Sequence, residues 1–423
     1  MQLVKVREKS YQDYLEYLDR EVVNELDLLI ERLKGKRVVM VNTTSFGGGV
    51  AEIMNSMVPL MRDMGLQVDW WTMKGEDEFF HVTKTFHNRM QGQEGRLTQK
   101  EKSIYLRYNK LNAELMQDWD YDFVVVHDPQ PAALISYRKP RAGEKWIWRC
   151  HIDTSTPNPE YWDFIYDYVS QYDASIFTME EFVKEGAQFK NLTIITPSVD
   201  PKSPKNQPLE TEEAKSIITR FGVDIHRPLI TQVSRFDPWK DPLGVIDAYR
   251  IVKKEFPSAL LALVGSMASD DPEGWDYLYK TIRRAGEDYD IMIVTNFNGV
   301  SDLEVNAFQT ASDIIIQKSL REGFGLTVSE GMWKGKPVIG GNVGGIKVQI
   351  DDGVNGFLVD TVEECAEKIL TLLRNPMLAE SMGEAGKEKV RHEFLLITNV
   401  LRYLRLFHSL TTEQEGVIAP AAK

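Results

Sequence analysis

Short apolar segments alternate with segments of helical spacing along most of the chain. In the first half, an apolar run at 37–41 precedes a helical pattern at 50–64, and a second apolar run follows at 68–73. This order of strand, helix and strand is typical of a βαβ unit and of a parallel sheet. Four further strands of the first half are predicted at 123–127, 146–150, 175–178 and 193–196. The pattern therefore predicts an α/β fold.

A polar segment at 197–208, rich in Pro, Ser and Lys, interrupts this alternation. A single core stops growing at roughly 250 to 300 residues, so a chain of 423 residues is expected to divide. We expect a first domain at 1–203, which the C-terminal residues 395–423 rejoin, and a second domain at 204–394. The last stretch, from about residue 379 onward, is predicted to be helical. The strands of the second domain are predicted at 229–234, 260–264, 291–294, 314–317, 338–340 and 357–359.

Charge and composition narrow the classes of partner. The chain has 63 Asp and Glu against 50 Lys and Arg, a formal net charge of -13, which disfavours a nucleic-acid partner. Cys150 and Cys365 lie far apart without a metal-binding spacing, so neither a disulfide framework nor a zinc site is expected. The amino terminus lacks the apolar core of a signal peptide, and no run approaches 18 apolar residues. We expect a cytoplasmic protein with no membrane partner, and the sequence leaves a homodimer open.

A glycine run lies between the first predicted strand and helix, in the sequence NTTSFGGGV. Glycines let backbone N–H groups approach an anion closely, and a helix N-terminus adds partial positive charge. Gly48 and Gly49 are therefore candidates for binding a phosphate group. The run matches neither GxGxxG nor the P-loop, so a tight turn is the alternative interpretation.

Two cations follow the first predicted strand of the second domain, in the sequence SRFDPWKD. Arg235 and Lys240 lie five residues apart at the carboxyl end of that strand. There they can clamp a diphosphate and neutralise the charge of a leaving group. A solvated loop with surface ion pairs is the alternative.

The sequence EGFGLTVSE at 322–330 is the most specific candidate. Glu322 is expected in a loop and Glu330 inside the next helix, so each carboxylate needs a partner of its own. A loop carboxylate beside glycines can accept hydrogen bonds from sugar hydroxyls, and the N–H groups of Gly325 to Thr327 can face a phosphate. Glu330 can hold a ribose diol. A helix N-terminus that favours acidic residues would explain Glu322 but not Glu330.

Histidines and aspartates stand at two predicted strand ends, in VVVHDP and WRCHID. Open parallel sheets bind ligands outside the carboxyl ends of their strands. His127, Asp128, His151 and Asp153 are therefore candidates for a sugar pocket, in which His151 can hydrogen-bond a hexose hydroxyl. A satisfied structural histidine is the alternative. Zinc is not expected, because no HExxH or comparable spacing occurs.

Taken together, these motifs resemble a known enzyme family. The E-x₇-E pattern from Glu322 to Glu330, with SRFDPWKDP ahead of it, resembles the retaining glycosyltransferases of the GT-B fold. In the first domain, TSFGGGVAEI, TKTFHNRMQG, VVVHDPQP and WRCHID are similar to the trehalose glycosyltransferring synthase group. The resemblance implies two Rossmann-like, doubly wound parallel-sheet domains that face a deep cleft. It also implies a C-terminal helix that crosses back to the N-terminal domain.

The resemblance further implies a reaction. Glucose would pass from a nucleoside diphosphate glucose, ADP- or UDP-glucose, to free glucose, so that trehalose is made or reversibly cleaved. The first domain would bind the acceptor and the second the nucleotide sugar. Arg235 and Lys240 would bind the diphosphate, while Glu322 would bind the glucose hydroxyls. Glu330 would bind the ribose. The backbone that lines the donor phosphate and sugar would come from Gly323, Phe324, Gly325, Leu326 and Thr327.

In the first domain, His151 matches the histidine that contacts the donor sugar. Asp128 matches an aspartate near the acceptor in the related trehalose phosphate synthases, and Gly48 and Gly49 match their glycine loop. One departure matters. Glu-Gly-Phe-Gly at 322–325 stands where those synthases have Asp-Gly-Met-Asn, which disfavours a phosphorylated acceptor.

Other functions stay open at this point. A trehalose phosphorylase, which uses glucose 1-phosphate, shares much of the pattern, and a sugar-nucleotide epimerase or a non-catalytic sensor can have the same fold. No carboxylate stands out as the nucleophile of a double displacement, so the resemblance favours a front-face transfer. No acidic DxD motif stands at an expected strand end. The sequence therefore names no metal ligands and leaves assistance by Mg²⁺ open.

Overall fold

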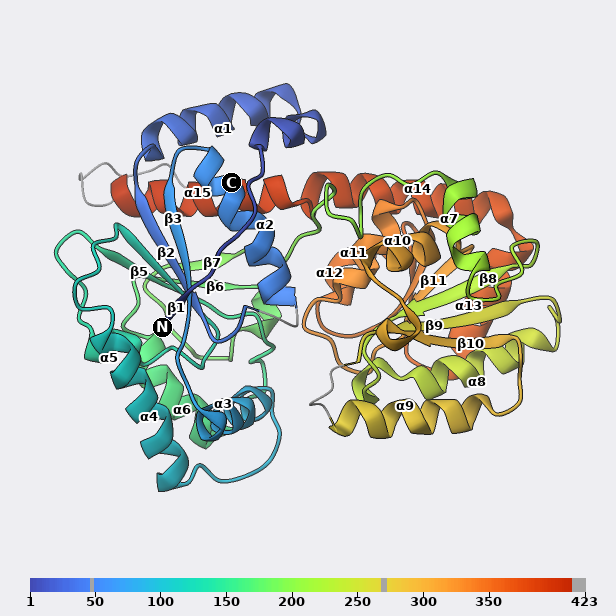
Figure 1. Ribbon diagram of the computed structural model, residues 1–423, viewed down its shortest axis with the longest axis horizontal. Coiled ribbons are helices and arrows are strands. Elements are labelled where there is room, and N and C mark those ends of the chain that lie inside the picture. The colour runs from blue at the N-terminus through green and yellow to red at the C-terminus, as the bar shows by residue number, and fades with distance from the viewer. Residues whose placement is uncertain (46–48, 268–271, 413–423) are drawn as a thin grey trace. The chain divides into compact units, whose positions relative to one another are not determined.

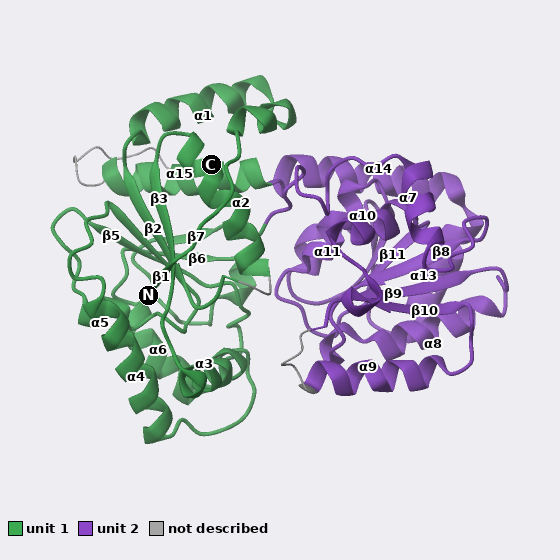
Figure 2. Cartoon of the chain, in the orientation of Figure 1, with its two compact units in different colours: residues 1–197, 396–423 green, residues 198–395 purple. Residues whose placement is uncertain are grey.

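The computed structural model describes residues 1–45, 49–267 and 272–412 (Figure 1). The chain forms two compact units (Figure 2). Unit 1 comprises Met1–Pro197 and Leu396–Lys423, and unit 2 comprises Ser198–Leu395. The observed divisions lie six residues before and one residue after the expected ones, at 203 and 394.

Unit 1 contains a seven-stranded sheet with the order β1-β3-β2-β4-β5-β6-β7. Neighbouring strands are parallel except for β1, which pairs with β3 in antiparallel orientation. Six of the strands lie where the apolar runs predict them. The seventh, β1, has two residues, too few for a periodic pattern. The strands are β1 (Gln2–Leu3), β2 (Arg37–Asn42), β3 (Gln67–Thr72), β4 (Phe123–His127), β5 (Lys145–Arg149), β6 (Ala174–Phe177) and β7 (Leu192–Ile194).

Helices cover both faces of this sheet (Figure 1). Helix α15 contacts both α1 and α2 on one side, where the rings of Phe123 and Phe407 stack 4.5 Å apart. The helical elements of unit 1 are η1 (Tyr11–Tyr17), α1 (Arg20–Leu33), α2 (Gly49–Asp63), α3 (Asp77–Met90), α4 (Gln99–Glu114), α5 (Leu134–Tyr137), α6 (Pro159–Val169), η2 (Glu180–Phe182) and α15 (Leu396–Thr412).

Unit 2 contains a parallel six-stranded sheet with the order β10-β9-β8-β11-β12-β13. Alternate residues of β9 enter two different apolar clusters, Leu261 and Leu263 on one face and Leu260 and Ala262 on the other. This sheet is therefore buried on both sides, as expected for a doubly wound fold. The strands are β8 (Leu229–Val233), β9 (Leu260–Gly265), β10 (Ile291–Thr295), β11 (Ile314–Gln317), β12 (Val338–Gly341) and β13 (Phe357–Val359).

The two faces of this sheet are covered by different helices. Helices α8, α9 and α13 contribute to one apolar cluster, and α7 and α10 contribute to the other. The helical elements of unit 2 are α7 (Thr211–Thr219), η3 (Pro238–Lys240), α8 (Pro242–Lys253), α9 (Pro272–Ala285), η4 (Asn296–Asn298), α10 (Asp302–Ala311), α11 (Leu326–Trp333), α12 (Ile346–Gln349), α13 (Val362–Arg374) and α14 (Pro376–Glu393).

The C-terminal stretch is helical, as the sequence predicts from about residue 379 onward. The structure divides it into two helices, which are separated at Phe394 and Leu395. The backbone N–H of Val199 donates to the carbonyl oxygen of Phe394 at 2.8 Å, and Val199 forms an isolated parallel bridge with Leu395. Both residues at the break are buried, so apolar packing and strand pairing replace the helical turn there. A periodic pattern alone does not reveal this exchange.

Strand order locates the binding edge of each sheet. In unit 2 the chain runs from β8 outward to β10 and then returns to the other side of β8 with β11. The loops after β8 and β11 therefore flank a topological switch point, where open α/β sheets bind ligands. In unit 1 the corresponding switch point lies between β2 and β4. The motifs identified in the sequence follow these strands.

Candidate active site

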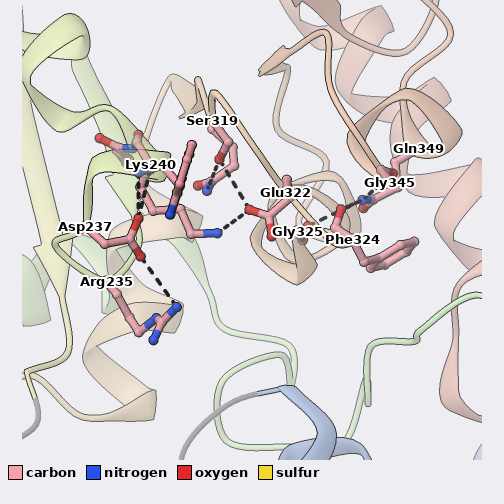
Figure 3. A network of polar contacts seen from close by, with 12 residues as sticks. Arg235, Asp237, Lys240, Ser319, Glu322, Phe324, Gly325, Gly345 and Gln349 are labelled. Atoms are coloured by element: carbon pink, nitrogen blue, oxygen red, sulfur yellow. Dashed lines mark hydrogen bonds and ion pairs between the residues drawn. The ribbon is translucent and has the colours of Figure 1, made fainter. Parts of the chain in front are cut away.

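Lys240 and Glu322 form an ion pair at the switch point of unit 2 (Figure 3). Lys240 ends the short helix after β8, and its Nζ contacts Oε2 of Glu322 in the loop after β11. The Ser319 hydroxyl donates to the same carboxylate oxygen at 3.3 Å. The side chains of Lys240 and Glu322 are 16% and 11% exposed, so the pair is largely desolvated. The structure thus brings together two residues that lie 82 positions apart in the sequence.

Two further contacts join the loops that present this pair. The backbone N–H of Leu320 donates to the carbonyl oxygen of Trp239 at 2.7 Å. The Lys318 ammonium lies 2.5 Å from Asp241 Oδ2, and Lys318 is almost fully buried. Asp241 adopts a left-handed conformation with φ 48°, from which its carboxylate caps α8 through the N–H of Gly244. These contacts fix the loop after β8 against the loop after β11, and the spacing of the residues in the sequence does not predict them.

Arg235 is connected to Lys240 through Asp237. The Asp237 carboxylate accepts hydrogen bonds from the N–H groups of Trp239 and Lys240, and its other oxygen lies 3.5 Å from Arg235 Nη2. The Arg235 side chain is 71% exposed, whereas that of Asp237 is 14% exposed. Arg235 is therefore an exposed cation that Asp237 connects to the largely buried Lys240. Two such cations can bind an anionic ligand through charge-assisted hydrogen bonds.

The side chain of Gln349 holds the loop at Gly323 to Gly325 in place. The Gln349 amide donates to the carbonyl oxygens of Phe324 at 2.5 Å and of Gly345 at 3.1 Å, while its oxygen accepts a hydrogen bond from Ser329. Gly325 has a φ of 83° and is the N-cap of α11, where it offers no side chain to the helix terminus. The first N–H groups of a helix lack intrahelical partners, so Leu326 and Thr327 present donors at this edge.

A second glycine pair supports the Glu322 loop, and the sequence reasoning missed it. Gly344 has a φ of 47°, and a Cβ there would lie 1.8 Å from the carbonyl oxygen of Glu322. At Gly345, a Cβ would lie 2.5 Å from the Cα of Phe324. The signal was present as the run GGNVGG, which begins in the last two residues of β12, but only tertiary packing shows which loop it accommodates.

Glu330 lies in α11, apart from Glu322, and has partners of its own. Its Oε1 is 2.9 Å from the ammonium of Lys205, and its Oε2 accepts a hydrogen bond from Gln309 at 3.2 Å. Glu330 is 1% exposed. Burial raises the pKa of this carboxyl, but Lys205 and Lys334 outweigh burial and lower it overall. Burial in turn lowers the pKa of Lys334 to about 7. Sequence reasoning missed Lys205, because it lies in the segment interpreted as a linker.

In unit 1, Asp128 and His151 meet at the carboxyl ends of β4 and β5. The Asp128 carboxylate accepts the backbone N–H of His151 at 2.8 Å, and its own N–H donates to the carbonyl oxygen of Arg149 at 2.7 Å. Asp128 adopts a left-handed φ of 66°. Its burial raises the pKa of the carboxyl to about 6, although the His151 N–H and the Arg149 cation oppose the shift.

Three candidates of unit 1 remain, namely Asp153, Gly48 and Gly49. The Asp153 carboxylate accepts hydrogen bonds from the N–H and the hydroxyl of Ser155, which indicates a local turn-forming role. Gly49 is the first residue of α2. Gly48 lies outside the described residues.

Comparison with known proteins assigns the family. The family model described as trehalose synthase, N-terminal domain, matches residues 40–184, and that of glycosyl transferases group 1 matches residues 216–389. The trehalose synthase of Thermococcus litoralis is 52% identical over 402 residues, which cover 95% of this chain and 97% of that protein. The chain belongs to the trehalose synthase family of glycosyltransferases. It is therefore a hexosyltransferase, as its motifs predict.

The sequence identity is high with a second trehalose synthase and low with a trehalose phosphorylase. The trehalose synthase of Rubrobacter xylanophilus is 50% identical over 413 residues, covering 97% of this chain and 99% of that protein. The trehalose phosphorylase of Pleurotus pulmonarius is 26% identical over 445 residues, covering 93% of this chain and 60% of that protein. The trehalose synthase likeness is thus much the stronger of the two.

Solved structures confirm the GT-B fold that the E-x₇-E pattern predicts. The sucrose-phosphate synthase from Thermosynechococcus elongatus superposes with a TM-score of 0.70 at 14% identity, covering 89% of this chain and all of that one. The trehalose 6-phosphate synthase from Burkholderia multivorans gives a TM-score of 0.68 at 14% identity, covering 90% and 99%. At such identities the likeness concerns the fold alone.

Along the described residues, no helix combines the length and apolar character that a membrane span requires. Within the same residues, no group of three or more His, Cys, Asp or Glu side chains is arranged to hold a metal ion.

Proposed function

We propose that this chain transfers glucose from a nucleoside diphosphate glucose to free glucose and forms trehalose with retention at the anomeric carbon. The observation that carries the proposal is the Lys240–Glu322 pair at the switch point of unit 2, with the exposed cation Arg235 beside it. A diphosphate needs cations and a sugar needs hydrogen-bond acceptors, and this edge offers both within one contact network. Membership of the trehalose synthase family supports glucose as the transferred group.

Unit 2 would bind the donor. An ammonium has three hydrogen-bond donors, so Lys240 can keep one on Glu322 and direct the others to a diphosphate. Arg235 can add a bidentate contact, and the first turn of α11 can add backbone donors. Glu322 then has its second oxygen for the glucose hydroxyls. In this arrangement the carboxylate positions both the sugar and the lysine.

Glu330 would bind the ribose. Its carboxylate is held by Lys205 and Gln309, which leaves further lone pairs on each oxygen. An anionic acceptor of this kind forms strong hydrogen bonds with a diol. Because Glu330 is almost fully buried, the side chains around its carboxylate must move aside for a ribose to reach it.

The chemistry would rest on positioning and charge. The bond between the anomeric carbon and the diphosphate oxygen breaks while the acceptor hydroxyl oxygen attacks from the same face. The departing diphosphate oxygen takes the acceptor proton, so atoms and charge balance without a protein nucleophile. Arg235 and Lys240 would stabilise the negative charge that grows on the leaving group. In unit 1, His151 would contact the donor sugar and Asp128 the acceptor.

A product assay tests the proposal. ADP-, UDP- and GDP-glucose are each incubated with glucose, glucose 6-phosphate or fructose, without added phosphate. We expect a non-reducing disaccharide and nucleoside diphosphate in equal amounts with free glucose as acceptor. Disaccharide formation that requires glucose 1-phosphate, or an epimerised sugar formed from the donor alone, would contradict the proposal.

One observation favours trehalose phosphorylase as the second candidate. Both oxygens of Glu330 already have protein partners, so this carboxylate can also be explained as purely structural. Glu330→Gln separates the two functions. Loss of a charged hydrogen bond costs about 1.5–3 kcal/mol, so the KM for a nucleotide sugar should rise by roughly 10- to 150-fold. A phosphorylase has no ribose to bind and should keep its KM for glucose 1-phosphate.

A further inference from the structure

Two histidines contact each other at the carboxyl ends of β4 and β5 in unit 1. His127 Nδ1 lies 2.9 Å from His151 Nε2, and the two rings are nearly parallel, at 13°. This is the distance of a hydrogen bond between ring nitrogens. His127 is 1% exposed, whereas His151 is partly exposed. His127 therefore contacts a proposed sugar-binding residue from inside the protein.

The proton content of the pair is restricted. Burial, followed by the Arg149 cation, lowers the pKa of His127 to about 3, and the same two causes lower the pKa of His151. Both rings are therefore neutral near pH 7, and each has one N–H and one lone pair. A hydrogen bond between them needs one N–H and one lone pair. The tautomer of one ring consequently determines the tautomer of the other.

Arg149 decides between the two arrangements. His127 and Arg149 are register partners on the parallel strands β4 and β5. Arg149 is 1% exposed, and among the described residues its Nε and Nη1 have no hydrogen-bond partner. Nε2 of His127 likewise has none in this part of the chain. An N–H on Nε2 of His127 would be one more buried donor without an acceptor, beside the two of Arg149, and the positive charge of Arg149 disfavours a further donor in these surroundings. Nε2 of His127 should therefore have the lone pair, which places the His127 proton on Nδ1.

We propose that His127 is a positioning residue that donates its Nδ1–H to His151 Nε2 and thereby holds the His151 proton on Nδ1. His151 then presents an N–H donor, rather than a lone pair, at its other ring nitrogen. The functional consequence rests on the proposed function, because a hydroxyl oxygen of the donor glucose would accept this hydrogen bond. In the opposite tautomer, Nδ1 of His151 would have a lone pair, and the glucose hydroxyl would have to donate the hydrogen bond instead of accepting it.

The tautomer is measured directly in the unliganded protein. Long-range ¹H–¹⁵N correlation spectra of the ¹⁵N-histidine-labelled chain distinguish Nδ1–H from Nε2–H rings, and His151→Asn assigns the His151 signals among the seven histidines. We expect the Nδ1–H form for both His127 and His151 at pH 7. An Nε2–H form of His151 in the wild-type chain would overturn the inference, and this measurement needs no folded variant of His127.

Two variants test whether His127 sets this state. His127→Phe removes the donor, so the His151 signals should move toward the Nε2–H form. We expect kcat to fall by about 10–100-fold, by analogy with the partners that orient metal-ligating histidines. His127→Asn keeps an N–H donor near the position of Nδ1 and should restore both the tautomer and most of the turnover. An unchanged His151 tautomer in His127→Phe would reject the inference while leaving the proposed function intact. Absence of trehalose in the product assay would reject the proposed function while leaving the spectra valid.

Discussion

The ammonium of Lys205 lies 2.9 Å from the carboxylate of Glu330 and connects the start of unit 2 to helix α11. The next residue, Asn206, also contacts the end of α11. The Lys334 ammonium lies 3.0 Å from the Asn206 side-chain oxygen, and the Trp333 indole N–H donates to the Asn206 carbonyl oxygen. Through Lys205 and Asn206, the segment 197–208 therefore packs against α11, which contains Glu330. Its Pro- and Lys-rich composition indicates a linker, but its lysine supplies the counter-charge of a buried carboxylate.

The first prediction concerns this pair. Lys205→Met should lower the free energy of unfolding by about 2–3 kcal/mol, because it leaves Glu330 buried with less counter-charge. The loss should be smaller than the roughly 3–5 kcal/mol of a fully broken buried pair, since Lys334 remains nearby. Urea denaturation measures the effect. Lys215→Met is the matched control, because its partner Glu212 is 84% exposed and such pairs contribute at most about 1 kcal/mol. Equal midpoints for both variants would contradict the role of Lys205.

Local pattern predicted the architecture but not the contacts that complete the site. Every predicted strand appears within a residue or two, because buried parallel strands read as continuous apolar runs. The loops with Lys240 and Glu322 could also be placed, since both follow adjacent strands at a switch point. Lys205, Gly344 and His127 could not be given their roles, because each role depends on a contact between segments far apart in the sequence. Spacing carries no information about such contacts.

The second prediction tests Arg235 as the leaving-group cation. With saturating donor, Arg235→Ala should lower kcat by about 10²–10³-fold, the usual effect of removing one group that stabilises transition-state charge. Stability should change by less than about 0.5 kcal/mol, because the side chain is 71% exposed. Arg283→Ala is a suitable control, since Arg283 is also an exposed arginine of unit 2 and lies in α9, outside the loops that follow β8 and β11. Near wild-type turnover of Arg235→Ala would exclude the proposed role.

The third prediction concerns the glycine that supports the Glu322 loop. Gly344→Ala should lower kcat/KM for the donor, because its Cβ would meet the Glu322 carbonyl oxygen at 1.8 Å and displace the loop. Gly335→Ala provides a matched comparison. Gly335 also has a left-handed φ, of 69°, but no atom lies within 4 Å of its Cβ position. Both variants should lose roughly 1–2 kcal/mol of stability from the left-handed conformation. Gly344→Ala should lose more, because the clash with the Glu322 carbonyl adds to this cost, and only Gly344→Ala should lose activity as well. Steady-state kinetics and thermal unfolding of the two variants decide this, and an equal loss of activity in both would refute the steric argument.

The fourth prediction uses the raised pKa of Asp128. Burial raises it from 3.8 to about 6, so the folded chain binds this proton more tightly than the unfolded chain. The contribution of Asp128 to stability therefore falls as the pH rises from about 4 to about 6 and is constant above about 7. A difference of about two pKa units corresponds to about 3 kcal/mol.

Asp128→Asn should remove this dependence. Asn keeps an oxygen for the His151 N–H and tolerates the left-handed φ of 66°, so the fold should persist. Relative to the wild-type chain, the variant should gain up to about 3 kcal/mol of unfolding free energy between pH 4 and pH 7. Urea titrations of both proteins at pH 4, 5.5 and 7 provide the comparison. Parallel stability curves over this range would mean that Asp128 has the same pKa in the folded and unfolded chains. Such a result would contradict the raised pKa of this buried carboxyl.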